Sequence, residues 1–157
     1  MEQKKILVVD DEQDVRETLE SVLKKLNYQP FVAEGGDTAL DIIKRQKIDV
    51  VLSDLYMPGM DGIELLKRIK SNDKNIVFLM ITAHPTIETA VEAIKKGAYD
   101  YLTKPFHIEE VRMKINRAME KRGLTYSLKW ANGLIWALII SIPIWLVLGI
   151  ILASLLS

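Results

Sequence analysis

Short apolar runs along this chain alternate with longer segments whose apolar residues recur at helical spacing. The first run, ILVV at residues 6–9, contains no polar residue, which is typical of a strand buried on both faces of a sheet. The segment after it has the i, i+4, i+7, i+8, i+11 pattern of an amphipathic helix, at Val15, Leu19, Val22, Leu23 and Leu26. The same alternation predicts strands over residues 29–33, 49–53, 76–82 and 99–102. Helices are predicted to begin near residues 37, 61, 87 and 108.

This pattern amounts to five strand–helix units in the first 122 residues. Strict alternation of this kind favours a parallel sheet with helices on both faces, and right-handed crossovers leave few topologies. We therefore expect an α/β fold, a doubly wound five-stranded parallel sheet in the flavodoxin-like order 2-1-3-4-5.

Composition and the absence of certain motifs exclude several functions and disfavour others. The 157 residues include 21 basic and 21 acidic side chains, so a net charge of zero gives no reason to expect nucleic-acid binding. No cysteine is present, which excludes disulfides and thiolate metal sites. The chain also lacks the GxxxxGK[ST] motif of a nucleotide-binding P-loop.

Polar side chains stand where the predicted strands end, and in an open parallel sheet the ligand crevice lies at those carboxyl ends. In chain order they are Asp10, Asp11, Asp54, Thr82 and Lys104, the last followed by Pro105. Each alone has an ordinary structural role, such as an aspartate beside a helix N-terminus. Together, three carboxylates repel one another and one lysine cannot neutralise them, so the set favours a hard divalent cation such as Mg²⁺.

These residues lie in segments that resemble the receiver domains of two-component response regulators. The segments are VVDDE at 8–12, SDLYMPGMDG at 53–62, ITA at 81–83 and KKGAYDYLTKPF at 95–106, and the resemblance extends from Lys4 to Arg122. The run TIETAVEAIKKGAYDYLTKPF looks most like receivers of the nitrogen-regulation, enhancer-binding class. The resemblance implies a flavodoxin-like receiver fold over residues 1–122.

The resemblance also implies a chemistry for the strand ends. Asp54 would accept a phosphoryl group from a sensor histidine kinase or a histidine phosphotransfer protein. Asp11, Asp54 and the backbone carbonyl of Tyr56 would bind Mg²⁺ (or Mn²⁺) directly, and Asp10 would act mainly through a bound water. The metal and Lys104 would neutralise the phosphoryl charge, without which a carboxylate is a weak nucleophile toward phosphorus.

The same resemblance implies a switch. Thr82 and Lys104 would move toward the phosphoryl oxygens, and Tyr101 would turn into the space that Thr82 leaves. That movement would change a surface made by the fourth helix, fifth strand and fifth helix. The Lys104–Pro105 bond would be a cis peptide, the one kind of peptide bond for which cis costs little.

The end of the chain has a different character. Residues 131–157 carry no charge, and the 23 residues from Leu134 to Leu156 would span about 34 Å as a helix, enough for a bilayer core of about 30 Å. We expect a transmembrane helix over 131–157 after a juxtamembrane linker over 123–130. The basic residues Arg117, Lys121, Arg122 and Lys129 precede it, which favours a cytoplasmic receiver on the inner membrane of a prokaryote, with a single pass.

Two alternatives for this segment stay open. Pro143 near its middle allows a re-entrant hairpin, although each half is too short to cross a bilayer. Small residues at every fourth position, among them Gly133, Ala137 and Ser141, permit close helix approach and a homodimer, but such residues are also common in membrane helices.

The function expected from these features is a membrane-anchored, single-domain response regulator. It would be a signalling protein and not an enzyme beyond its own phosphotransfer and dephosphorylation. Its partners would be the lipid bilayer and an output protein, which could itself be a membrane protein. The alternative is a phosphorelay intermediate or phosphate sink without an output partner. An aspartyl phosphatase of the haloacid-dehalogenase type is disfavoured because VVDDEQ lacks its DxDx[TV] motif, and a vestigial receiver is disfavoured because the polar set is complete.

Overall fold

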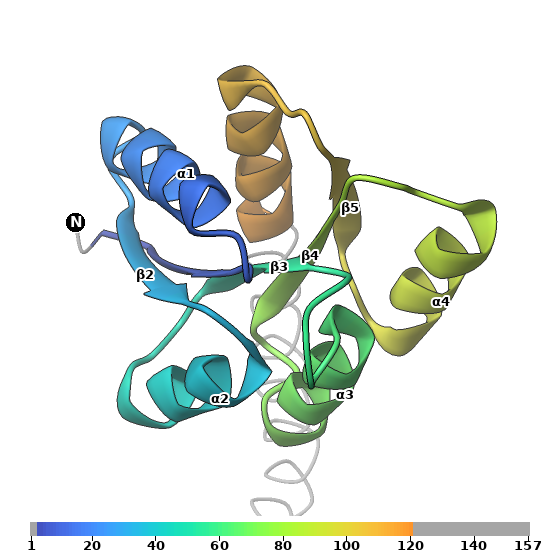
Figure 1. Cartoon of the computed structure of the whole chain (residues 1–157). Helices are drawn as coiled ribbons and strands as arrows, with labels where there is room; N and C mark the ends of the chain where they lie inside the picture. The colour runs from blue at the N-terminus through green and yellow to red at the C-terminus, as the bar shows by residue number, and fades with distance from the viewer. Residues whose placement is uncertain (1–2, 121–157) are drawn as a thin grey trace, which may run out of the picture. The chain divides into compact units, whose positions relative to one another are not determined.

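The structure, a computed structural model, describes residues 3–120 and consists of five strands alternating with helices (Figure 1). The elements are β1 (Lys5–Val9), α1 (Gln13–Lys25), β2 (Gln29–Ala33), α2 (Gly36–Arg45), β3 (Val50–Asp54), α3 (Gly62–Asn72), β4 (Val77–Thr82), α4 (Ile87–Lys96) and β5 (Asp100–Thr103). Residues 108–120 form a further helix after β5. Each predicted strand and helix of this part of the chain is present, with ends that differ by one or two residues.

All strand pairs are parallel, and the sheet order is β2-β1-β3-β4-β5, which confirms the predicted flavodoxin-like topology. The register pairs Val9 with Ser53, Asp54 with Ile81, and Thr82 with Thr103. The carboxyl ends of β1, β3, β4 and β5 are therefore level with one another. Side chains at the ends of four strands are brought to one edge although they are far apart in the sequence.

Two hydrophobic clusters cover the two faces of the sheet. One contains Leu7, Val51 and Phe78 together with residues of α2, α3 and α4, and the other contains Val8 and Leu52 with residues of α1 and the helix over 108–120. Figure 1 shows the same division of the helices between the faces. Every residue of β3 and β4 is buried, as expected for central strands without alternating polar positions.

Local signals in the sequence explain where the helices near the site begin and end. Asp61 caps α3, because its side chain accepts a 2.7 Å hydrogen bond from the Glu64 N–H. Thr86 and Thr89 form a capping box at the start of α4, and Gly97 ends that helix with a left-handed φ of 104°. These caps fix the two loops that follow β3 and β4, which flank the site.

The predicted transmembrane helix over 131–157 and its linker over 123–130 lie outside the described residues. Within residues 3–120, none of the helices combines the length and the apolar character that crossing a bilayer requires.

Candidate phosphoacceptor site

The strand register gathers four of the predicted polar residues at one edge of the sheet. Asp10 follows β1, Asp54 is the last residue of β3, Thr82 is the last residue of β4, and Lys104 follows β5. Asp10, Asp54 and Thr82 are buried, with exposed fractions of 0%, 7% and 3%. Buried polar groups are costly unless they are paired, so their partners indicate what the site is built to hold.

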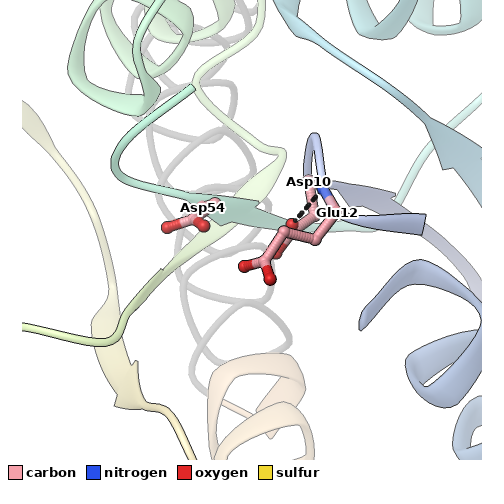
Figure 2. A group of neighbouring side chains, drawn as sticks. All are labelled: Asp10, Glu12 and Asp54. Carbon is pink, nitrogen blue, oxygen red and sulfur yellow. Dashed lines mark hydrogen bonds between the residues drawn. The ribbon is translucent and has the colours of Figure 1, made fainter. Parts of the chain in front are cut away.

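Three carboxylates form the centre of the site. Asp10, Glu12 and Asp54 each offer an oxygen, and these oxygens all lie within 4.8 Å of one another. Figure 2 shows Asp10 and Glu12 after β1 and Asp54 at the end of β3, with the hydrogen bond between the Glu12 N–H and Asp10 Oδ1, which is 2.9 Å long. The turn made by this bond places Glu12 beside the two aspartates.

Lys104 is the positive charge of the cluster. Its Nζ lies 2.8 Å from Asp10 Oδ2, 2.8 Å from Asp54 Oδ2 and 3.1 Å from Glu12 Oε1. Burial alone would lower the pKa of Lys104, but its contacts with the three carboxylates outweigh burial and raise that pKa above its ordinary value. Lys104 is therefore fully protonated and holds the ends of β1, β3 and β5 together.

The carboxylate of Asp10 is only partly compensated by Lys104. Its Oδ2 is buried and receives no well-directed hydrogen bond within residues 3–120; the 2.8 Å contact with Lys104 is an ion pair of poor hydrogen-bond geometry. Burial raises the pKa of Asp10 above its ordinary value, and the contacts with Lys104 and the Glu12 N–H only partly oppose this.

The charge of the cluster suits a divalent cation. Three carboxylates and one ammonium leave two negative charges at the site, and all candidate ligand atoms are carboxylate oxygens. Oxygen ligands from one to three carboxylates, completed by water, are what Mg²⁺ prefers. Asp10, Glu12 and Asp54 therefore fit the expected metal.

The roles of two other predicted metal ligands, Asp11 and the carbonyl of Tyr56, stay predictions. The side chain of Asp11 is exposed and is not part of the three-carboxylate cluster, so its role as a direct ligand stays a prediction. Tyr56, predicted to contribute its carbonyl, is 57% exposed, and its N–H lies 3.4 Å from Asp54 Oδ1. Glu12 was not predicted as a site residue, although it ends the VVDDE segment.

Within residues 3–120, the hydroxyl of Thr82 accepts one hydrogen bond and donates none. Thr82 Oγ1 accepts a 3.1 Å hydrogen bond from the His84 N–H, and the Thr82 carbonyl accepts a 2.8 Å bond from the Lys104 N–H. The hydroxyl can therefore still donate its own hydrogen. It has the chemistry needed to bind an oxygen of a group attached to Asp54.

Tyr101 and the peptide beside Lys104 complete the predicted set. Tyr101 on β5 is 38% exposed, and the ammonium of Lys114 lies 5.6 Å from the centre of its ring. Lys114 is itself fixed by a 2.6 Å ion pair with Asp100. The Lys104–Pro105 peptide is cis.

Comparison with known proteins identifies the arrangement. The family profile described as response regulator receiver domain matches residues 6–116. The chain belongs to this family. Receiver domains are the phosphoryl-accepting, signalling domains of two-component systems and not classical enzymes; they bind Mg²⁺ through an acidic pocket, which here is the cluster of Asp10, Glu12 and Asp54. They interact with histidine kinases or phosphotransfer proteins, and some form dimers.

Among curated relatives of this receiver, sporulation initiation phosphotransferase F of Bacillus subtilis is 42% identical over 117 residues, covering 74% of this chain and 94% of the relative. The regulatory protein AtoC of Escherichia coli is 38% identical over 120 residues, covering 76% of this chain. The receiver spans only 26% of AtoC, and 24% of the transcriptional regulator NtrC of Klebsiella pneumoniae, with which it is 40% identical.

Solved structures agree with this placement. NtrX from Brucella abortus superimposes with a TM-score of 0.78 at 35% identity, over 82% of this chain and 30% of NtrX. The beryllofluoride-activated NtrC4 receiver domain dimer gives a TM-score of 0.73 at 38% identity, over 76% of this chain and 99% of that domain. The resemblance to nitrogen-regulation receivers is thus supported for the receiver domain.

Proposed function

We propose that this protein is a membrane-anchored response regulator that accepts a phosphoryl group on Asp54 from a histidine kinase or a histidine phosphotransfer protein. The observation that carries the proposal is the contact of Lys104 Nζ with Asp54 Oδ2, at 2.8 Å, inside a cluster of three carboxylates. In this arrangement the Asp54 carboxylate lies beside one fixed cation, Lys104, and the acidic pocket can hold a second cation.

In the proposed transfer, a lone pair on an Asp54 carboxylate oxygen forms the new O–P bond. The phosphorus–nitrogen bond of the donor phosphohistidine breaks, its electron pair returns to the imidazole, and that nitrogen takes up a proton from water. Mg²⁺, held by the carboxylates of the acidic pocket, would supply positive charge at the phosphoryl oxygens. Lys104 supplies the fixed protein cation, and the Thr82 hydroxyl donates to a phosphoryl oxygen after transfer.

The proposed output surface lies on α4, β5 and the helix over 108–120. Large apolar side chains are exposed there, namely Ile87 (79%), Val91 (44%), Ile94 (48%), Tyr101 (38%) and Met113 (43%). Of these, Ile87, Val91 and Ile94 recur at helical spacing on one side of α4, and an exposed apolar stripe of this kind is typical of a protein-binding surface. Its partner in this proposal is an output protein or a second copy of this receiver.

Membrane anchoring is proposed from the sequence of residues 131–157, which has no charge over a length sufficient to span a bilayer. The basic residues before it would keep the receiver on the cytoplasmic side of a prokaryotic inner membrane. Fractionation of cells that express the full chain tests this, with Leu146→Arg combined with Leu148→Arg as the charged variant and Leu146→Ala as control. We expect wild type and control in the membrane fraction and the double variant outside it; a soluble wild type would refute anchoring.

A second candidate is a phosphorelay intermediate or phosphate sink. It is favoured by the match to sporulation initiation phosphotransferase F, which this chain covers almost from end to end. The lifetime of the phosphoryl group separates the two functions, because a sink must lose its phosphate quickly and a switch must hold it long enough to bind its partner.

Phosphorylation itself is tested by incubating the full-length protein with labelled acetyl phosphate and Mg²⁺. Wild type is expected to take up label, and Asp54→Asn is expected to take up none, because only a carboxylate can form the acyl phosphate. Asp41→Asn, at an exposed aspartate on α2, is the matched control and should behave as wild type. Equal labelling of Asp54→Asn and wild type would refute the proposed acceptor.

A further inference from the structure

Glu12 belongs to the carboxylate cluster, but the mechanism above gives it no part beyond helping to hold the metal. Its Oε1 accepts a 3.1 Å hydrogen bond from Lys104 Nζ, across 92 positions of the chain. The other two carboxylates on this ammonium belong to Asp10 and Asp54, each at 2.8 Å. An ammonium group has three N–H donors, and here three carboxylates surround it.

The three carboxylates differ in how easily they release the lysine. The side chains of Asp10 and Asp54 are 0% and 9% exposed, whereas that of Glu12 is 63% exposed. A buried carboxylate that loses its cation stays desolvated, but an exposed one is rehydrated by water. Glu12 is therefore the partner that Lys104 gives up at least cost.

A phosphoryl group on Asp54 would change the surroundings of Lys104. It adds about 1.5 to 2 negative charges and strong acceptor oxygens within reach of Lys104. Because oxygens of three carboxylates already lie within 3.1 Å of this ammonium, a phosphoryl oxygen would have to compete with them for it. The geometry makes Glu12 the competitor of the phosphoryl oxygen for Lys104.

We propose that Glu12 is a positioning residue that holds Lys104 in its resting place and competes with the phosphoryl group for it. The inference rests on the proposed phosphorylation of Asp54. This role differs from that of a simple metal ligand. If Glu12 competes for Lys104, removing its charge should increase the affinity for an anion at Asp54. If Glu12 were only a metal ligand, removing its charge should mainly decrease the affinity for Mg²⁺.

The experiment separates the two affinities. Full-length wild type, Glu12→Gln and the control Glu34→Gln, an exposed glutamate directly after β2, are titrated first with Mg²⁺ alone and then with beryllofluoride at saturating Mg²⁺. We expect Glu12→Gln to bind beryllofluoride about three- to ten-fold more tightly than wild type, the size of effect typical of one exposed ion pair or slightly more. Because Glu12 also belongs to the carboxylate cluster that fits the metal, the Mg²⁺ affinity of Glu12→Gln is expected to fall, but by less than about ten-fold.

A second measurement tests whether Glu12 acts through Lys104. The effect of Glu12→Gln on Mg²⁺ affinity is compared in the wild-type and the Lys104→Met backgrounds, and a positioning role requires that the effect differ between them. Equal effects in both backgrounds, or unchanged beryllofluoride affinity in Glu12→Gln, would overturn the inference. A loss of Mg²⁺ affinity of ten-fold or more without a gain for the anion would make Glu12 a metal ligand and would overturn it as well.

Failure of the underlying function has a different signature. If the wild type binds no beryllofluoride at any Mg²⁺ concentration, the proposed phosphorylation of Asp54 falls and the competition falls with it. If the wild type binds beryllofluoride and only Glu12→Gln departs from expectation, the phosphorylation stands and the competition alone is refuted.

Discussion

Lys104 Nζ and Asp54 Oδ2 lie 2.8 Å apart, although the residues are 50 positions apart in the chain and their strands, β5 and β3, are separated by β4. The lysine side chain thus crosses the end of a buried strand to reach its partner. This contact joins the end of β5 to the end of β3, and its loss has consequences for both stability and metal binding.

Replacing Lys104 with methionine leaves three neighbouring carboxylates without their cation. We expect the free energy of unfolding in Mg²⁺-free buffer to fall by about 1–3 kcal/mol, because an uncompensated buried charge is costly. Mg²⁺ should restore more stability to this variant than to wild type, since it supplies the missing positive charge. Urea unfolding with and without Mg²⁺ measures both effects. Lys95→Met, at an exposed lysine of α4, is the control and should show neither; equal loss in both variants would contradict the prediction.

The ionised carboxylate of Asp10 should lower the free energy of unfolding at neutral pH. Burial raises the pKa of Asp10 above 3.8, so the folded chain binds this proton more readily than the unfolded chain does. Stability is therefore lost as pH rises through the interval above 3.8. Asp10→Asn should raise the free energy of unfolding by roughly 1 kcal/mol at pH 7, a common size for one substitution, and the advantage should shrink as pH falls toward 3.8.

The control for this prediction is Asp41, whose pKa is shifted in the opposite direction. The hydrogen bond from Lys44 lowers the pKa of the exposed Asp41, so its charge favours the folded state at neutral pH. Asp41→Asn should therefore give no gain in stability. Urea midpoints of both variants between pH 5 and 8 test the difference; a gain in both would show that net charge, and not the buried site, is responsible.

Gly62 packs directly against the backbone of Asp54, the proposed phosphoacceptor. A Cβ at this position would lie 2.3 Å from the Asp54 carbonyl oxygen and 2.8 Å from Met80 Sδ. Gly62→Ala must therefore displace the end of β3, with an expected loss of about 1–3 kcal/mol of stability from overpacking and slower labelling by acetyl phosphate. Gly35→Ala is the matched control, because its Cβ would meet nothing within 4 Å and its φ of −176° is extended. Equal effects of the two substitutions would contradict this account.

Lys114 should hold Tyr101 outward. Its ammonium lies 5.6 Å from the ring centre and is anchored by Asp100 at 2.6 Å. Lys114→Met should shift the outward–inward balance of Tyr101 by about 0.5–1 kcal/mol toward the inward position, the strength of an exposed cation–π contact. Fluorotyrosine at position 101, observed by NMR in the unphosphorylated protein, measures the balance. Lys114→Arg keeps the cation and should behave as wild type, whereas identical spectra for Lys114→Met and wild type would refute the contact's role.

The fold could be predicted because its determinants are local. Runs such as residues 6–9 and the helical spacing after them reveal the type of each element, and the alternation restricts the topology. The strand ends then follow, since parallel strands in register bring Asp54 and Thr82 to one edge. Once the strand order is given, the gathering of four polar residues at one edge follows from where the strands end.

The identity of the inward-facing acids could not be predicted from periodicity. Asp10 turns inward because its carboxylate accepts the Glu12 N–H, and this turn leaves Asp11 exposed. Glu12 reaches the site through Lys104, which is 92 positions away. The pairing of Lys114 with Asp100 and Tyr101 depends on how the helix over 108–120 packs against β5, which the sequence pattern does not specify.

The complete burial of β3 has a consequence for the rate at which its amide hydrogens exchange with deuterium. All five residues from Val50 to Asp54 are buried, and the first four are paired with both β1 and β4, so the amides inside this strand are expected to exchange only when the whole domain opens. The loop from Leu55 to Asp61 has no such protection over most of its length. Asp54 therefore lies at the boundary between slowly and rapidly exchanging amides. A phosphoryl group on Asp54 would change the exchange rates of the loop amides, while the amides of β3 would report the rate of global opening as an internal reference.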